Sequence, residues 1–373
     1  MYGYGNSMFL ATHGILARTN AAVLPVNTVA PALSGTAQEG QTLTCSTGTW
    51  TGTPIITYTY QWKRNGSNIG SATNSTYTLV TADVGQSIKC TVTATNGAGS
   101  VNADSNTVVP VSAFTGLLDT YPNASAAYSL RKLRTAYTGN CIQVRRSSDN
   151  TAQNFGFVNN VLDTASLLTF VGAGDGFVTT WYDQSGNANN LTQATVLNQP
   201  QIVSSGSVIN EALKPTLKFD GLNNRMTNST INISQPITRF IVGKSTGGGL
   251  PDTFADSNDS ANRFAIYRAG DGAFYSSYAN AGTQIGILGN ANRNLLYELG
   301  NNTTSVIARN GLTGTTGNVG TNGLNGLTIG DLRISGAGYI LQGNIQEMII
   351  YGSNQSTNRT GIESNINTFY TIY

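Results

Sequence analysis

Charged side chains, histidine and cysteine are scarce in this sequence, and it has no long apolar run. Only 10% of the 373 residues are charged, against about 25% in typical soluble domains. Glycine, threonine, serine and asparagine take their place, and these residues favour strands and turns over helices. We therefore expect an all-β protein, and its length indicates at least two domains.

These absences exclude several classes of function. A net charge of +2 gives no basis for binding nucleic acid or a membrane surface. No segment approaches the roughly 18 apolar residues of a membrane-spanning helix. His13 is the only histidine, so a Ser–His triad is excluded, and no metal-ligand spacing is present. We expect no metal, no cofactor, no nucleic-acid partner and no membrane partner.

Residues 28–112 alternate between apolar and polar positions, as in "QTLTCST" and "QSIKCTVTATN". The order Cys45, Trp62, Cys90 is typical of an immunoglobulin-like sandwich, in which the Trp packs on the two inter-sheet sulfurs. Asn65-Gly66 predicts a tight hairpin turn. Cys45 and Cys90 are candidates for a disulfide, and two reduced core thiols are the alternative.

The same segment resembles the immunoglobulin-like modules of bacterial and phage surface proteins. "TADVGQSIKC" is similar to the entry into their strand F. Ile88 stands where the tyrosine-corner residue of such domains lies, so that hydrogen bond is expected to be missing.

Beyond this domain we predict a linker at 113–123 and a larger sandwich at 124–373, with short helices at both ends. The stretch "SAAYSLRKLRTAY" has apolar residues at helical spacing, and so does the C-terminal "GIESNINTFYTIY". The apolar positions of these two expected helices are Ala126, Leu130, Leu133 and Tyr137, and Ile362, Ile366, Phe369 and Tyr373.

Residues 124–373 resemble a concanavalin A/laminin-G jelly roll in "KPTLKFDGLNNRMT" and "GNIQEMIIYGSNQS". More specifically, "AYSLRKLRTAYTGNCIQVRRSSDNTAQNFGF", "WYDQSGNANNLTQ" and "AIYRAGDG" are similar to the catalytic domain of α-L-arabinofuranosidase B. The YDQSGN motif also occurs in phage-encoded lectin-like domains. We interpret it as a structural turn around Asp183, with a calcium site as the alternative.

Hydrolysis of a glycoside normally requires two carboxylates. The resemblance implies a Glu nucleophile on the strand after the "AGDG" turn, but Ala273 to Gln284 contain no Asp or Glu. It also implies an Asp as acid/base, which Asp331 in "LTIGDLRIS" can match, and adjacent cysteines, which are missing. Asp271 and Glu298 are the possible substitutes for the nucleophile. Asp331 therefore remains as a residual catalytic candidate in a domain expected to bind rather than cut.

Sugar recognition uses aromatic faces together with a few polar groups in a shallow cleft. Candidate glycan-binding residues are Arg268, Asp271, Tyr275, Tyr278 and Asp331.

The domain pairing and the low charge favour a non-enzymatic structural or adhesive protein on the surface of a phage particle, as a capsid decoration, head fibre or tail appendage. In this hypothesis residues 1–27, which lack the pattern of a signal peptide, attach many copies or a homo-oligomer to other virion proteins. The second sandwich then faces host or environmental glycans. The alternatives are a secreted or virion-borne α-L-arabinofuranosidase and a bacterial cell-surface adhesin.

Overall fold

The computed structural model describes residues 21–247, 251–259, 262–270, 272, 274–279, 284–332 and 339–373. Contacts between residues divide the chain into two compact units, Met1–Ala113 and Phe114–Tyr373. The expectation of residues 1–27 as an attachment arm falls mostly outside the described residues.

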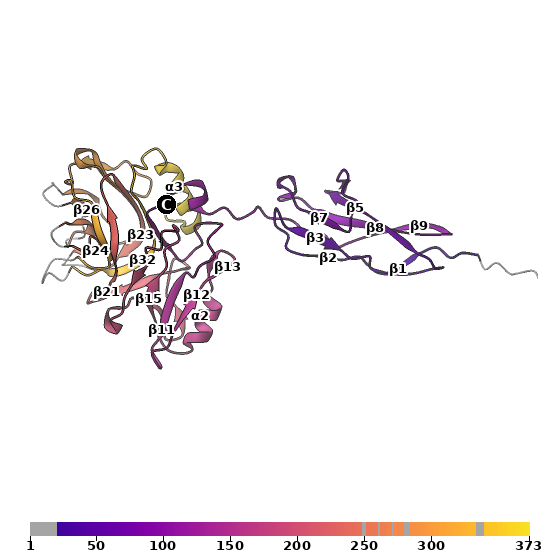
Figure 1. Cartoon of the computed structure of the whole chain (residues 1–373), viewed down its shortest axis with the longest axis horizontal. Helices are drawn as coiled ribbons and strands as arrows, with labels where there is room; N and C mark the ends of the chain where they lie inside the picture. Colours follow the sequence, from indigo (N-terminus) through magenta and orange to yellow (C-terminus); the bar gives the residue numbers. More distant parts are fainter. Residues whose placement is uncertain are drawn as a thin grey trace, which may run out of the picture. The chain divides into compact units, whose positions relative to one another are not determined.

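The first unit is built from short antiparallel strands with regular turns (Figure 1). Its sheets have the orders β1-β4, β2-β3-β7 and β6-β5-β8-β9. The strand bounds are β1 Val26–Val29, β2 Leu33–Ser34, β3 Thr42–Cys45, β4 Thr49–Thr51, β5 Thr57–Arg64, β6 Ser67–Asn68, β7 Thr76–Thr78, β8 Ile88–Asn96 and β9 Gly99–Asp104. The two-residue turn between β5 and β6 holds Asn65 at φ 49° and Gly66 at φ 83°, which confirms the predicted hairpin.

The core of this unit contains the predicted Cys–Trp–Cys set. Trp62 pairs with Cys90 across β5 and β8, and Cys45, Trp62 and Cys90 are buried in one apolar cluster. All three cysteines of the chain are free thiols, so the structure has the reduced alternative and not the candidate disulfide. A hydrogen bond from the neighbouring thiol lowers the pKa of Cys45 and raises that of Cys90. Ile88, which we expected at the position of a corner tyrosine, is fully buried.

The second unit is a jelly roll whose strands form one closed sheet with two broad faces. One run of pairings is β12-β11-β15-β17-β21-β32-β23-β28-β29-β30, and the other is β16-β22-β31-β24-β25-β26-β27, joined where β15 pairs with β16. Figure 1 shows β21, β32 and β23 side by side. This architecture confirms the predicted all-β fold class.

The strands of the first run are β11 Ile142–Arg146, β12 Ala152–Phe155, β15 Gly176–Trp181, β17 Gln201–Ser204, β21 Leu217–Asp220, β23 Ile237–Ser245, β28 Asn294–Gly300, β29 Ser305–Arg309, β30 Thr315–Gly317 and β32 Gln342–Tyr351. Those of the second run are β16 Leu191–Thr192, β22 Met226–Ile233, β24 Asp252–Asp256, β25 Phe264–Arg268, β26 Phe274–Ala279, β27 Ile285–Leu288 and β31 Leu324–Ile329. Short pieces complete the unit: β10 Ala126–Ser129, β13 Phe157–Val158, β14 Val161–Leu162, β18 Ser207–Val208, β19 Asn210–Glu211, β20 Lys214–Pro215, α1 Leu117–Thr120, α2 Thr164–Val171 and α3 Arg359–Tyr370.

The main core lies between the two faces, and a second apolar cluster lies under α1 and α3. Ile362, Ile366 and Tyr370 of α3 are buried there with Leu117 and Leu118 of α1. This confirms the predicted C-terminal helix. The segment 113–123, which we expected to be a linker, instead contributes α1 to the second unit, because its two leucines are buried against that unit.

The helix predicted near Ala126–Tyr137 is wrong. Ala126–Ser129 form β10, which pairs with Ile350–Glu347 of β32. All four residues of β10 are buried, so pairing with a central strand outweighs the weak helical spacing. No helix in the part of the chain that the structure describes is long and apolar enough to cross a membrane.

Candidate glycan-binding site

The YDQSGN turn is a structural element of the second unit. The Asp183 carboxylate is 4% exposed, and it accepts hydrogen bonds from the backbone N–H groups of Ala127 (2.8 Å), Ser185 (2.8 Å) and Asn189 (3.0 Å). Gly186 has a positive φ of 97°, which closes the turn. The carboxylate therefore ties the turn to β10, in agreement with the structural interpretation.

Gln184 extends this tie. Its amide accepts a hydrogen bond from Leu133 N–H (2.8 Å) and donates to the carbonyls of Ser129 and Arg131 (both 3.0 Å). Both polar atoms of the fully buried Gln184 amide thus bind the end of β10 and the residues that follow it, as a buried polar group requires.

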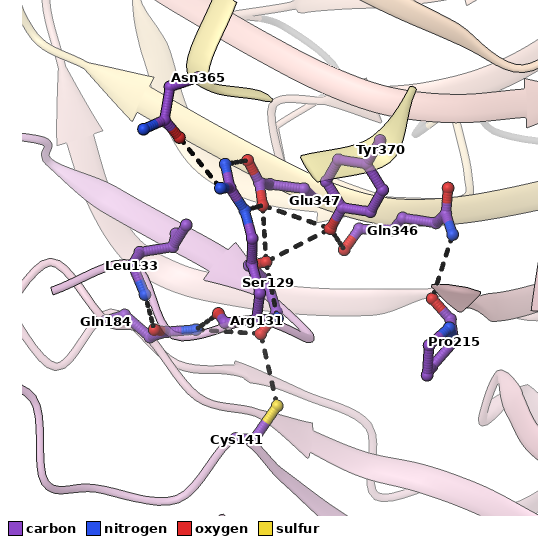
Figure 2. A network of polar contacts seen from close by, with 10 residues as sticks. All are labelled: Ser129, Arg131, Leu133, Cys141, Gln184, Pro215, Gln346, Glu347, Asn365 and Tyr370. Atoms are coloured by element: carbon purple, nitrogen blue, oxygen red, sulfur yellow. Dashed lines mark hydrogen bonds and ion pairs between the residues drawn. The ribbon is translucent and has the colours of Figure 1, made fainter. Parts of the chain in front are cut away.

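A buried ion pair continues the network toward α3. Figure 2 shows Arg131 facing Glu347, with Ser129 and Tyr370 beside them. The guanidinium binds the carboxylate through two nitrogens, at 2.8 Å and 2.9 Å, and Asn365 of α3 accepts a third bond at 2.9 Å. Burial favours a lower pKa for Arg131, but the charge of Glu347 outweighs it and raises the pKa. This network holds α3 against the sheet.

The outer face of β25 and β26 carries aromatic and polar side chains. Phe264 and Ile266 of β25 belong to the core, so Tyr267, which follows Ile266, points to the opposite face. In β26, Tyr275 and Ala279 belong to the core, and Tyr278 points outward by the same alternation.

These outward side chains line a cavity of about 210 Å³. Its walls are Pro251, Arg263, Tyr267, Tyr278, Gln284, Leu332 and Tyr339. The volume lies below the roughly 300–1,000 Å³ typical of sites for drug-sized ligands, so the cavity suits a single sugar residue. We call it the tyrosine pocket. Three phenol rings with an amide and a guanidinium supply the apolar faces and hydrogen bonds that sugar recognition uses.

Arg263 is held in place by Asp256 at the end of β24. Arg263 Nε lies 3.1 Å from Asp256 Oδ2, and the guanidinium carbon lies 5.4 Å from the ring centre of Tyr278. Asp256 Oδ1 accepts the N–H groups of Ser257 (2.8 Å) and Phe264 (3.2 Å). Burial raises the pKa of Asp256, and Arg263 opposes that shift. Asp256 is fully buried and orients Arg263 without lining the pocket.

Asp331 lies next to the pocket residue Leu332 and is 8% exposed. Arg225 Nη1 lies 3.3 Å from Asp331 Oδ2. The positive charge of Arg225 compensates the negative charge of Asp331, which we predicted as the residual catalytic candidate.

The structure brings only part of the predicted glycan-binding set to this face. Tyr278 lines the tyrosine pocket and Asp331 adjoins it. Tyr275 is fully buried, where its hydroxyl donates to the carbonyl of Asn290 at 2.9 Å, so it is no longer a candidate contact. Asp271 lies outside the described residues.

Arg268 also turns toward the interior. It is 9% exposed, and its Nη1 donates to Ser245 Oγ and the carbonyl of Gly247, both at 3.1 Å. It therefore leaves the candidate set as well. Glu298, considered as a substitute nucleophile, is fully buried and paired with Arg239. Within the described ranges, no three or more His, Cys, Asp or Glu side chains gather as a metal site.

Sequence reasoning missed Arg263, Tyr267, Gln284 and Tyr339. Tyr267 carried a usable signal, since it alternates with two core residues in "RFAIYRAG". The other three lie near strand ends and turns, where alternation does not decide which way a side chain faces.

Residues 119–221 match the family described as alpha-L-arabinofuranosidase B, catalytic. No curated protein matches the chain. The match includes the YDQSGN turn but ends before the residues of the tyrosine pocket.

Two solved structures have a similar fold. One is an arabinofuranosidase complexed with arabinofuranosyl-alpha-1,2-xylobiose, with 15% identity and a TM-score of 0.50. The other is a GH54 a-l-arabinofuranosidase soaked with a cyclic sulfate inhibitor, with 16% identity and a TM-score of 0.50. Each alignment covers 65% of this chain and 62% of the other chain, so the chain matches less than two thirds of either enzyme. The second unit thus has the jelly-roll fold seen in arabinofuranosidases.

Proposed function

We propose that the second unit is a carbohydrate-active domain that binds a glycan in the tyrosine pocket without cutting it. One observation carries the proposal: the described lining of the pocket has three tyrosines, an arginine and a glutamine, but no carboxylate. Asp256 and Asp331 are paired with arginines, and Asp252, next to the lining residue Pro251, accepts hydrogen bonds from Ser245 Oγ and Gln342 N–H. A glycosidase needs two carboxylates at the scissile bond, whereas binding needs only the rings and hydrogen-bonding groups.

The binding test uses the full-length protein. Titration calorimetry with arabinofuranosyl oligosaccharides should show binding that Tyr278→Ala weakens about five- to 150-fold, because a stacked ring contributes about 1–3 kcal/mol. Phe274→Ala is the matched control, since Phe274 is 42% exposed on the same strand and does not line the pocket. Equal affinity in wild type and Tyr278→Ala would contradict the proposal.

Hydrolysis of an α-L-arabinofuranoside is the second candidate function. The family match and the fold favour it, and so does the pairing of Asp256 with β31, the strand that Asp331 follows. Asp256 pairs with Thr328 of β31, three residues before Asp331, which corresponds to about 10 Å along a strand. In this candidate Asp331 acts as acid once Arg225 moves away. Release of nitrophenol from an aryl arabinofuranoside, lost on Asp331→Asn, would establish it.

We further propose that the protein is displayed on the surface of a phage particle. The low charge and the pairing of an immunoglobulin-like unit with a lectin-like unit support this placement. In this proposal residues 1–27 attach the chain to other virion proteins. Antibody labelling of intact particles tests it: deletion of residues 1–20 should abolish the label, and retained label would contradict the role of the arm.

A further inference from the structure

Arg145 of β11 is a buried arginine without an acidic partner. It is 7% exposed. Its Nε donates to Gln199 Oε1 at 2.7 Å and its Nη1 to Asn150 Oδ1 at 2.8 Å, and both acceptors are neutral amides. The buried Arg131 and Arg239 of the same unit pair instead with Glu347 and Glu298.

Burying a charge without a counter-charge is unfavourable. Burial accordingly lowers the pKa of Arg145. The guanidinium carbon lies 4.8 Å from the ring centre of Phe177, and this cation–π contact offsets only part of the cost. The position is therefore suited to an anion that arrives from outside the chain.

Arg145 faces an open pocket that can admit such an anion. The cavity measures about 330 Å³. Its lining is Arg145, Phe177, Val196, Leu197, Gln199, Gln201, Lys218, Asp220 and Asn224. The third guanidinium nitrogen, Nη2, donates to no described residue and is not among the buried unpartnered atoms, so it remains open to a ligand.

A second cation, one carboxylate and an apolar side chain complete the pocket. Lys218 of β21 is exposed and lines it, and no ion pair of Lys218 occurs among the described residues. Asp220 also lines the pocket, but its Oδ1 accepts the backbone N–H groups of the following turn, at 2.9–3.3 Å. Two cations against one engaged carboxylate leave the pocket with net positive charge. Leu197, 75% exposed, offers an apolar surface beside them.

We propose that this pocket binds an oxyanion carried by a sugar, a carboxylate or a phosphate ester, between Arg145 and Lys218. An arginine fork with a free Nη2 matches the geometry of such groups, and Leu197 and Phe177 contact the sugar ring. The pocket shares no described lining residue with the tyrosine pocket. The inference goes beyond the proposed function and stands or falls separately from it.

The test is titration of the full-length protein with glucuronate, glucose 6-phosphate, inorganic phosphate and glucose. The two anionic sugars should bind and glucose should not. Arg145→Met keeps the packing on Phe177 and should weaken binding at least about tenfold, because a charge-assisted hydrogen bond is lost. Lys218 is exposed, so the Lys218→Gln variant is expected to fold like wild type. It should weaken binding about two- to fivefold. Lys132→Gln serves as the control lysine, and Tyr278→Ala should leave anion affinity unchanged.

The four ligands distinguish which kind of anion the pocket binds. Binding of both sugars and of inorganic phosphate supports a general oxyanion site, while binding of glucuronate alone restricts it to sugar carboxylates. Failure of both anionic sugars to bind at millimolar concentration would overturn the proposal. Binding that Arg145→Met and Lys218→Gln leave intact would overturn it too, since the anion would then lie elsewhere.

Discussion

Glu347→Gln should strongly destabilise the second unit. The substitution removes the negative charge that Arg131 contacts at 2.8 Å and 2.9 Å, and both side chains are more than nine-tenths buried. Removing one partner of a buried ion pair costs about 3–5 kcal/mol, because the other charge stays buried and unpaired. Ser129 also loses its charged acceptor, at 2.7 Å. For a unit of this size, that cost lowers the melting temperature by about 6–20 °C.

Thermal unfolding followed by circular dichroism measures the effect. The double variant Arg131→Met, Glu347→Met is the control: it removes both charges, and we expect it to lie within about 2 kcal/mol of wild type. A loss of less than about 1 kcal/mol in Glu347→Gln, or a double variant as unstable as the single one, would refute the argument that the uncompensated charge sets the cost.

Three further outcomes are expected. Asp183→Ala should lower the free energy of unfolding by about 3 kcal/mol or more, because it leaves buried N–H groups unpaired. Asp163→Ala removes a single capping hydrogen bond, from Ser166 N–H at the start of α2, and should cost clearly less than Asp183→Ala. Equal losses in urea unfolding would contradict the scaffold role of the YDQSGN turn. Burial raises the pKa of Tyr137 to about 12 and that of Tyr297 to about 12. Their contribution to stability is thus present below about pH 10 and lost as the pH rises through 12; titration of tyrosinate absorbance should show a class ionising later than exposed tyrosines, and a single class near 10 would count against it. Trp62→Ala should cost about 3–5 kcal/mol in the first unit, and denaturant unfolding of that unit should show it without a change in the second.

Strand alternation made the first unit predictable. Leu43, Cys45, Trp62, Cys90 and Val92 all recur at the period of a half-buried strand, and all are buried. For the second unit, the turns and motifs predicted the fold class, a jelly roll, but not every element. The region after Ala126 was not, because four consecutive buried residues suit a strand and a helix equally, and only the pairing with β32 decides between them.

The site was less predictable than the fold. "FYSSYA" places Tyr275 and Tyr278 on either side of two serines, so composition does not show which ring faces the core. The register of β26 against β25 decides it, and register is a property of the folded sheet. Arg225, the partner of Asp331, is distant in sequence. Arg263 is close to Asp256 in sequence, but the two lie on either side of a turn, and the spacing of charges along the chain gave no sign of their pairing.

The most direct test of the central claim is a proton NMR time course of an arabinofuranosyl oligosaccharide mixed with the full-length protein. The account predicts broadened sugar signals, restored to their free widths with Tyr278→Ala, and no new anomeric signal after prolonged incubation. Appearance of free arabinose with wild type and not with Asp331→Asn would contradict it.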